Sequence, residues 1–292
     1  MAASNREFRA ESLGPARELA LPQGAIRYHS VGSGPAVVFV HGLLVNANLW
    51  RKVVAELSAD FRCVALDLPF GSHVLPMPPD ADLSPPAVAD LIADAIAALE
   101  LDDVTLVGND TGGGICQIVV TRRPERIGAL VLTSCDAFDN FPPKLMRPLM
   151  PVLSNAALLR PALSPARAGA VQRAVFKTVA KRPVEADALA SYTLPAITSP
   201  GVRRDLARFS RGLDPRHTLE AAERLPAFDR PALIAWSRDD MIFPSSHAER
   251  LAELLPQGRL EWIDDARTFS PEDQPARVAE LLASVSAAGP AR

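Results

Sequence analysis

Residues 105–114 read Thr-Leu-Val-Gly-Asn-Asp-Thr-Gly-Gly-Gly, a short apolar run that leads directly into a cluster of small residues. Gly108 and Gly112 stand two residues before and two residues after Asp110. This spacing permits a very tight turn from a strand into a helix, which pushes the central side chain out above the sheet edge. The first N–H groups of such a helix favour a negative charge at the same place. We therefore expect Asp110 to occupy the position of a nucleophile.

Outside this stretch, short apolar runs alternate with longer segments of helical period. The runs have the length and residue types of strands that are buried on both faces. They are residues 36–40, 63–66, 105–107, 130–132 and 232–235. Helices are expected after the N-cap Ser84, from Ser245 to about Leu255, and from Gln274 onward. The alternation predicts an α/β fold with a mostly parallel central sheet flanked by helices.

The alternation stops between residues 138 and 225, which contain many prolines and no convincing strand. Because this segment is too long for a loop in a compact domain, it predicts a helical insertion that lies over the sheet. We expect a core formed by residues 1–137 and 226–292, and a helical cap domain formed by residues 138–225. Residues 137–213 contain twelve Lys or Arg and four Asp or Glu, an excess of eight positive charges. Such an excess indicates either a solvated outer face or a cationic lid that attracts an anionic substrate or partner.

The composition excludes several classes of protein. Of the 292 residues, 48% are apolar and 22% are charged, as in soluble globular domains. The sequence has no apolar run long enough for a membrane span and a polar start, so we expect no membrane partner and no secretory signal. The net charge of −3 gives no reason to expect nucleic acid as a partner. The oligomeric state is not determined by these features.

Cysteine and histidine usage restricts the chemistry. Cys63, Cys116 and Cys135 all lie in apolar runs, which predicts reduced core thiols and a cytoplasmic protein. The sequence contains no Cys/His cluster with metal-ligand spacing and no nucleotide-binding fingerprint. We therefore expect no metal and no cofactor, and a small-molecule substrate.

Two further motifs stand in order around the turn at Asp110. His41-Gly42 directly follow the first central run, and residues 236–244 read Trp-Ser-Arg-Asp-Asp-Met-Ile-Phe-Pro after the last one. With these motifs the sequence resembles the α/β-hydrolase superfamily from about Tyr28 to Leu282. The resemblance implies the α/β-hydrolase fold with a helical cap. Because the nucleophile elbow carries Asp and not Ser, the chain looks most similar to the branch of haloalkane dehalogenases and epoxide hydrolases.

The resemblance also implies roles for individual residues. Asp240, four residues before a proline, matches the acid that orients a catalytic histidine. The backbone N–H groups of Leu43 and Thr111 match an oxyanion hole. Their side chains differ from the asparagine and tryptophan with which dehalogenases hold the leaving halide. Epoxide hydrolases use two cap tyrosines, and this cap contains only Tyr192.

The catalytic histidine of the family is missing. Residues 264–275 match the loop that normally carries it, and Thr268 occupies its position. Threonine cannot act as a general base at neutral pH. His73 is the best replacement base, because it lies in the loop after the strand run 63–66, where ligand sites of open α/β sheets form. Asp136, which follows the run 130–132, is a further carboxylate that could face the same pocket.

These features lead to one hypothesis and two alternatives. The hypothesis is a hydrolase of small apolar or anionic organic substrates that uses Asp110 as nucleophile or acid-base group. The first alternative is a ligand-binding protein that has lost turnover, which Thr268 favours. The second is a lyase or isomerase on the same fold, in which Asp110 only moves a proton.

Overall fold

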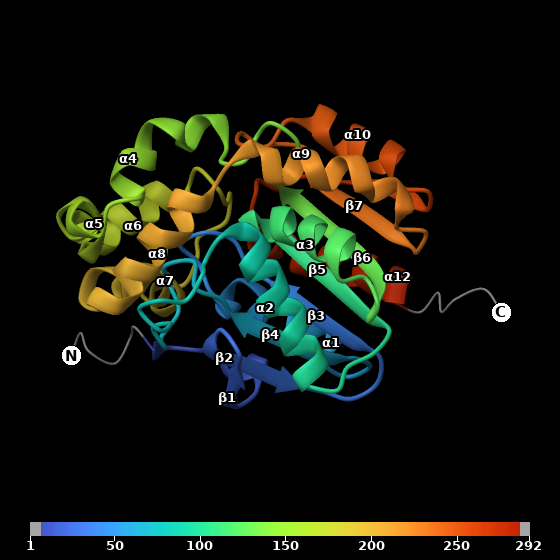
Figure 1. Ribbon diagram of the computed structural model, residues 1–292, viewed down its shortest axis with the longest axis horizontal. Helices are drawn as coiled ribbons and strands as arrows, with labels where there is room; N and C mark the ends of the chain where they lie inside the picture. Colours follow the sequence, from blue (N-terminus) through green and yellow to red (C-terminus); the bar gives the residue numbers. More distant parts are fainter. Residues whose placement is uncertain (1–6, 287–292) are drawn as a thin grey trace.

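A computed structural model describes residues 7–286 and contains one eight-stranded sheet (Figure 1). The strand order is β1-β2-β4-β3-β5-β6-β7-β8; β2 is antiparallel to β1 and β4, and the pairs from β4 to β8 are parallel. The strands are β1 (Ala16–Leu21), β2 (Gly24–Val31), β3 (Ala36–Val40), β4 (Arg62–Asp67), β5 (Val104–Asp110), β6 (Ile127–Cys135), β7 (Ala232–Ser237) and β8 (Gly258–Ile263). All five predicted strands are therefore confirmed, within a mostly parallel sheet.

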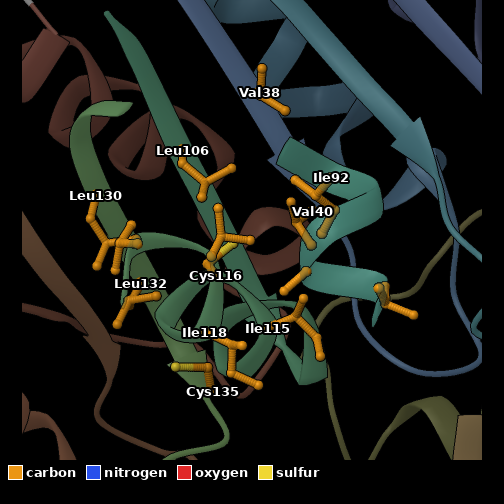
Figure 2. Close-up of a cluster of buried hydrophobic side chains, with 14 of the residues drawn as sticks. Val38, Val40, Ile92, Leu106, Ile115, Cys116, Ile118, Leu130, Leu132 and Cys135 are labelled. Carbon is orange, nitrogen blue, oxygen red and sulfur yellow. The ribbon is translucent and has the colours of Figure 1, made fainter. Parts of the chain in front are cut away.

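Helices cover both faces of the sheet and form two hydrophobic cores. Alternate strand residues point to opposite faces, so Val38 and Val40 belong to one core while Val37 and Phe39 belong to the other. The first core packs against α2, α3, α9 and α10, and Figure 2 shows strand residues of this core beside side chains of α2 and α3. The second core packs against α1 and α12. The helices are α1 (Arg51–Leu57), α2 (Pro85–Ala98), α3 (Thr111–Arg122), α9 (Pro215–Arg224), α10 (Ser245–Leu254), α11 (Ser270–Asp273) and α12 (Pro275–Ser286).

The predicted helix boundaries are close to those of the structure. Helix α2 begins at Pro85 with Ser84 as its N-cap residue, as expected. Helix α10 begins at Ser245 itself, and Pro244 is the residue at its N-cap. The final helix is preceded by the single turn α11, because Pro275 interrupts the backbone hydrogen bonds between them.

The segment between β6 and β7 is entirely helical and contains no strand among its residues, all of which the structure describes. Figure 1 shows α4–α8 grouped together beside the sheet. These helices are α4 (Met150–Leu153), α5 (Ala156–Leu163), α6 (Gly169–Phe176), α7 (Ala186–Thr198) and α8 (Pro200–Gly212), with the 3-10 turns η4 (Lys144–Leu149) and η5 (Ser164–Arg167). Ala221 and Ala222 of α9 instead join the core that contains α3. We propose a cap domain that ends near Leu213, before α9, and not at residue 225.

Two further observations concern membrane-spanning helices and the thiols. No helix within residues 7–286 combines the length and the apolar character that crossing a bilayer would require. The three cysteines are free and buried, and burial raises the pKa of the Cys63 thiol to about 12.

Candidate active site

The turn between β5 and α3 places Asp110 at the carboxyl end of a central strand. Asp110 has φ 54° and ψ −133°, a backbone conformation that costs energy for a residue with a Cβ atom. The glycines around it allow this approach of strand and helix. A Cβ on Gly112 would lie 2.4 Å from the carbonyl oxygen of His41, and a Cβ on Gly42 would lie 2.1 Å from Asp110 Oδ2. The small residues predicted to permit a tight turn therefore meet neighbouring chain segments at contact distance.

Backbone N–H groups hold the Asp110 carboxylate from two sides. Leu43 N donates to Asp110 Oδ2 at 3.0 Å, and the N–H of Thr111 also donates to this carboxylate. Burial and, to a smaller extent, the charge of Asp240 nevertheless raise the pKa of Asp110 to about 7, against these two hydrogen bonds. Asp110 is consequently divided between its acid and its carboxylate form near neutral pH.

Asp240 lies in the loop after β7 and is almost enclosed. Its Oδ1 accepts hydrogen bonds from the N–H groups of Ile242 (2.7 Å) and Phe243 (2.9 Å). Its Oδ2 is buried and has no hydrogen-bond partner within the described residues. Burial raises the pKa of Asp240, while the hydrogen bonds that it accepts oppose this change.

Thr268 forms a direct hydrogen bond with the Asp240 carboxylate. Its Oγ1 donates to Asp240 Oδ1 at 3.1 Å, and its carbonyl oxygen accepts a hydrogen bond from Asn109 Nδ2 at 2.8 Å. Thr268 is fully buried. The threonine is thus in contact with the group that would orient a histidine.

Asp136 forms a third buried carboxylate next to Asp110. Its N–H donates to the carbonyl oxygen of Asp110, and the hydroxyl of Thr111 lies 3.2 Å from its Oδ2. Burial raises the pKa of Asp136 well above its usual value, and the neighbouring Asp110 carboxylate adds to this effect. Asp136 lies behind Thr111 and is not among the residues that line the cavity. In the sequence, only the position of Asp136 directly after strand β6 indicated that it could lie near Asp110.

A cavity of about 350 Å³ lies above Asp110, between the strand ends and the helices of the inserted segment. Of the 25 residues that line it, Asp110 is the only charged one. The structure brings together Leu43, Thr111 and Tyr192 in this lining. Because the lining contains no Lys or Arg, the idea that basic side chains meet an anionic substrate inside the pocket is not supported.

Tyr192 does not present a free hydroxyl to this cavity. Its OH lies 3.4 Å from Glu272 Oε1, and Glu272 also forms a salt bridge with the buried Arg51. Burial raises the pKa of Tyr192 well above its usual value. The tyrosine hydroxyl is engaged in this buried polar cluster and leaves its ring as the surface that a ligand would meet.

The histidines lie away from the Asp110 carboxylate. His73, predicted as a replacement base, is buried with its Nε2 3.2 Å from Asp205 Oδ2 in α8, and it lines a different pocket from Asp110. A role of His73 as base is therefore not supported, because its ring contacts Asp205 of helix α8 and does not line the cavity above Asp110. His41 accepts a hydrogen bond from Leu68 N at 2.9 Å, and burial lowers its pKa to about 4, which fits a neutral structural residue. Within residues 7–286 no group of three His, Cys, Asp or Glu side chains is arranged to hold a metal ion.

This fold and site define the class of protein. Residues 37–281 match the family described as "Alpha/beta hydrolase family", so the chain belongs to the α/β-hydrolase family. It is 27% identical to haloalkane dehalogenase 2 of Mycobacterium tuberculosis over 89% of this chain and 91% of that protein. It is also 27% identical to 2-hydroxymuconate semialdehyde hydrolase of Pseudomonas sp. (strain CF600), covering 87% of each chain.

Solved structures give the same fold. An α/β-hydrolase fold protein from Burkholderia ambifaria superimposes with a TM-score of 0.78 at 22% identity, covering 94% of this chain and 97% of that chain. Haloalkane dehalogenase DbeA from Bradyrhizobium elkani superimposes with a TM-score of 0.76 at 19% identity, covering 94% and 99%. At these identities the likeness establishes the fold, and function must be argued from the site.

Proposed function

We propose that the protein is a hydrolase that acts on a neutral, largely apolar small molecule, with Asp110 as nucleophile. The observation that carries this proposal is the Asp110 carboxylate at the floor of an otherwise uncharged cavity, held by the N–H groups of Leu43 and Thr111. A carboxylate in such surroundings is weakly solvated and directed at the ligand, which favours attack on carbon.

The first half-reaction would form an ester on the enzyme. An oxygen of Asp110 bonds to an electrophilic carbon of the substrate, and the leaving group departs with the electron pair of the broken bond. The attack needs the ionised form of Asp110, so its rate should rise with pH until about pH 7.

The second half-reaction needs a base, and we assign this role to Asp240, which does not line the cavity but is close enough for its charge to raise the pKa of Asp110. Its Oδ2 is buried without a hydrogen-bond partner in the described chain, and its raised pKa makes it a better proton acceptor than an ordinary carboxylate. Water would give one hydrogen to Asp240 while its oxygen bonds to the ester carbonyl carbon. The resulting oxyanion would be held by the N–H groups of Leu43 and Thr111. The alcohol would then leave with the proton from Asp240, and Asp110 would lose the second hydrogen of the water to solvent.

Neither named activity of the family branch is favoured by the side chains. Thr111 and Leu43 stand where a dehalogenase holds its halide, and Tyr192, the one tyrosine of the inserted segment, is bonded to Glu272. A relative of similar identity is named as a 2-hydroxymuconate semialdehyde hydrolase, so the proposal is not restricted to haloalkanes and epoxides. Three free, buried cysteines support a reducing, cytoplasmic location.

A mass measurement tests the aspartyl-ester mechanism. The protein is incubated in heavy-oxygen water with haloalkanes, epoxides and activated esters, and its intact mass is followed over time, with Asp110→Asn as control. We expect a persistent alkyl adduct, or heavy oxygen in the Asp110 carboxylate if the ester is hydrolysed. No mass change across the panel would overturn the mechanism.

The second candidate function is binding of an apolar ligand without turnover. The contact between Thr268 and Asp240 favours it, because no histidine can relay a proton there. In that case a ligand would raise the melting temperature while the protein mass and the ligand remain unchanged. A converted ligand with an unlabelled protein would instead indicate a lyase or isomerase.

A further inference from the structure

The inserted segment carries an unusual concentration of positive charge. Residues 140–184, which we call the basic segment, contain eight Lys or Arg and no Asp or Glu. Three of the eight form salt bridges with carboxylates outside the segment, namely Lys144, Lys181 and Arg182. The other five are exposed and have no salt bridge with any described residue; they are Arg147, Arg160, Arg167, Arg173 and Lys177. A face with this many unpaired cations attracts an anionic surface.

The same segment exposes most of the large apolar side chains of the surface. Seven such side chains are exposed in the described part of the chain, and five of them lie in the basic segment. They are Leu145 (63% exposed), Leu149 (51%), Leu158 (46%), Val171 (37%) and Val175 (56%). Val171 and Val175 are one helical turn apart in α6 and so share one face of that helix. Leu145 lines the same cavity as these two valines, so these three exposed side chains lie in one region, and neighbouring exposed apolar side chains mark an interaction surface.

The apolar cavity opens through this surface. Leu145, Val171 and Val175 are exposed, and all three also line the cavity above Asp110. We call these three residues the mouth. The mouth therefore connects a cavity whose only charged lining residue is Asp110 with a segment that exposes apolar side chains and cations without salt bridges.

We propose that the basic segment docks on an anionic lipid surface, with the mouth against the bilayer. Basic side chains beside exposed apolar ones are the combination that holds a helix in the plane of a membrane interface, and cytoplasmic leaflets are anionic. A bilayer would supply both a negative surface and neutral apolar molecules for the cavity. The passage of substrate through the mouth rests on the proposed function, whereas the docking rests on the surface alone.

A second copy of the chain fits this face less well. In a two-fold symmetric dimer the same patch meets itself, so the unpaired cations of the two copies would repel each other. A lipid surface of opposite charge has no such cost. The docking is peripheral and needs no membrane-spanning helix.

Vesicle binding tests the proposal with the full chain. We expect co-sedimentation with vesicles of phosphatidylcholine and phosphatidylglycerol, weaker binding to phosphatidylcholine alone, and release as salt is added. The variant Arg147→Gln/Arg173→Gln should bind roughly five-fold more weakly for each charge removed. The variant Val171→Ser/Val175→Ser should bind roughly ten-fold more weakly, because less apolar surface enters the interface.

Matched control variants lie outside the basic segment. Leu219→Ser removes an apolar side chain of similar exposure (39%). Arg259→Gln removes an exposed cation, paired with Glu261, near the amino end of β8, whereas Asp110 lies at the carboxyl end of β5. Both should bind vesicles as the unsubstituted protein does. The proposal is overturned if anionic vesicles do not bind, or if the mouth and control variants bind equally. A dimer in solution that Val171→Ser/Val175→Ser dissociates, without vesicle binding, would assign the surface to a second copy.

The vesicle test and the mass test can fail independently. Asp110→Asn removes the proposed nucleophile but no exposed side chain of the basic segment, so it should bind vesicles normally. Loss of vesicle binding with intact labelling of Asp110 would reject only the docking, and the reverse result would reject only the aspartyl-ester mechanism.

Discussion

Asp110 combines a place in the cavity lining with an energetic cost. Its carboxylate is partly buried, shares its surroundings with Asp136 and Asp240, and has a pKa raised to about 7 by burial. In an unfolded chain an aspartate has a pKa of about 3.9. The folded state therefore binds the Asp110 proton more tightly, and ionising this group costs stability.

This cost predicts a pH-dependent effect of Asp110→Asn. The protonated Asp110 contributes to the free energy of unfolding. This contribution is fully present below about pH 4 and is lost as the pH rises through about 7. The variant cannot ionise, so at pH 8 it should exceed the unsubstituted protein in free energy of unfolding by roughly 1–3 kcal/mol. Below pH 4 the difference should be small. Urea denaturation across this pH range measures it, with the exposed Asp80→Asn as control; a difference independent of pH would contradict the prediction.

Thr268 is the residue whose replacement most directly probes the second half-reaction. A histidine at this position would be next to Asp240, which could accept a hydrogen bond from Nδ1 and orient the ring. Thr268→His should therefore shorten the lifetime of an alkyl adduct on Asp110 by roughly 100-fold, the lower range for general-base catalysis. Intact-mass decay after removal of the alkylating reagent measures this lifetime.

The control for this substitution is Thr268→Val, which removes the hydroxyl without supplying a base. It should not shorten the adduct lifetime. A folded Thr268→His protein with an unchanged lifetime would show that position 268 does not reach the ester.

At the scale of elements, the turn from β5 into α3 depends on glycines packed against backbone. A Cβ on Gly112 would approach the carbonyl oxygens of Val40 and His41 to 2.5 and 2.4 Å. These atoms belong to the end of β3 and cannot move without disturbing the central sheet. The helix therefore packs close to the strands only because this position has no side chain.

Gly112→Ala should lower the free energy of unfolding by roughly 2–4 kcal/mol, because either β3 or α3 must shift. Gly169→Ala in α6 is the matched control, since the nearest atom to its Cβ would be the flexible Arg173 guanidinium at 3.2 Å. Urea denaturation should show little or no loss for Gly169→Ala. Equal losses for the two variants would contradict the packing argument.

At the scale of the whole molecule, the inserted helices and the strand ends enclose a cavity that contains one charge, and that charge is negative when Asp110 is ionised. The cations of the inserted segment remain on its outer surface. The cavity should consequently select neutral apolar ligands and reject carboxylates of the same length.

A matched pair of ligands tests this selectivity. Octanol should raise the melting temperature at pH 8, whereas octanoate should have little effect, because its carboxylate finds no cation in the lining and is repelled by Asp110. Differential scanning fluorimetry measures both. Asp110→Asn should reduce the discrimination, and stronger stabilisation by octanoate would restore the hypothesis of an anionic substrate.

The sequence by itself determined the α/β architecture, the five central strands and the tight turn at Asp110. These features depend on local properties, namely apolar periodicity, glycine spacing and the order of motifs along the chain. The strands and the turn could be predicted because each is contained within about ten neighbouring residues, and the architecture because strand and helix patterns alternate along the chain. The resemblance matched Asp240 to an acid that orients a histidine and Thr268 to the position of that histidine, and in the structure Thr268 Oγ1 lies 3.1 Å from Asp240 Oδ1.

Only the tertiary structure decided which polar groups pair and which remain free. In the folded protein, polar contacts join His73 to Asp205, Tyr192 to Glu272 and Thr111 to Asp136. No Lys or Arg lines the cavity. Each of these contacts joins segments that lie far apart in the sequence. Their distances follow from how helices and strands pack against one another, and residue spacing along the chain carries no information about that packing.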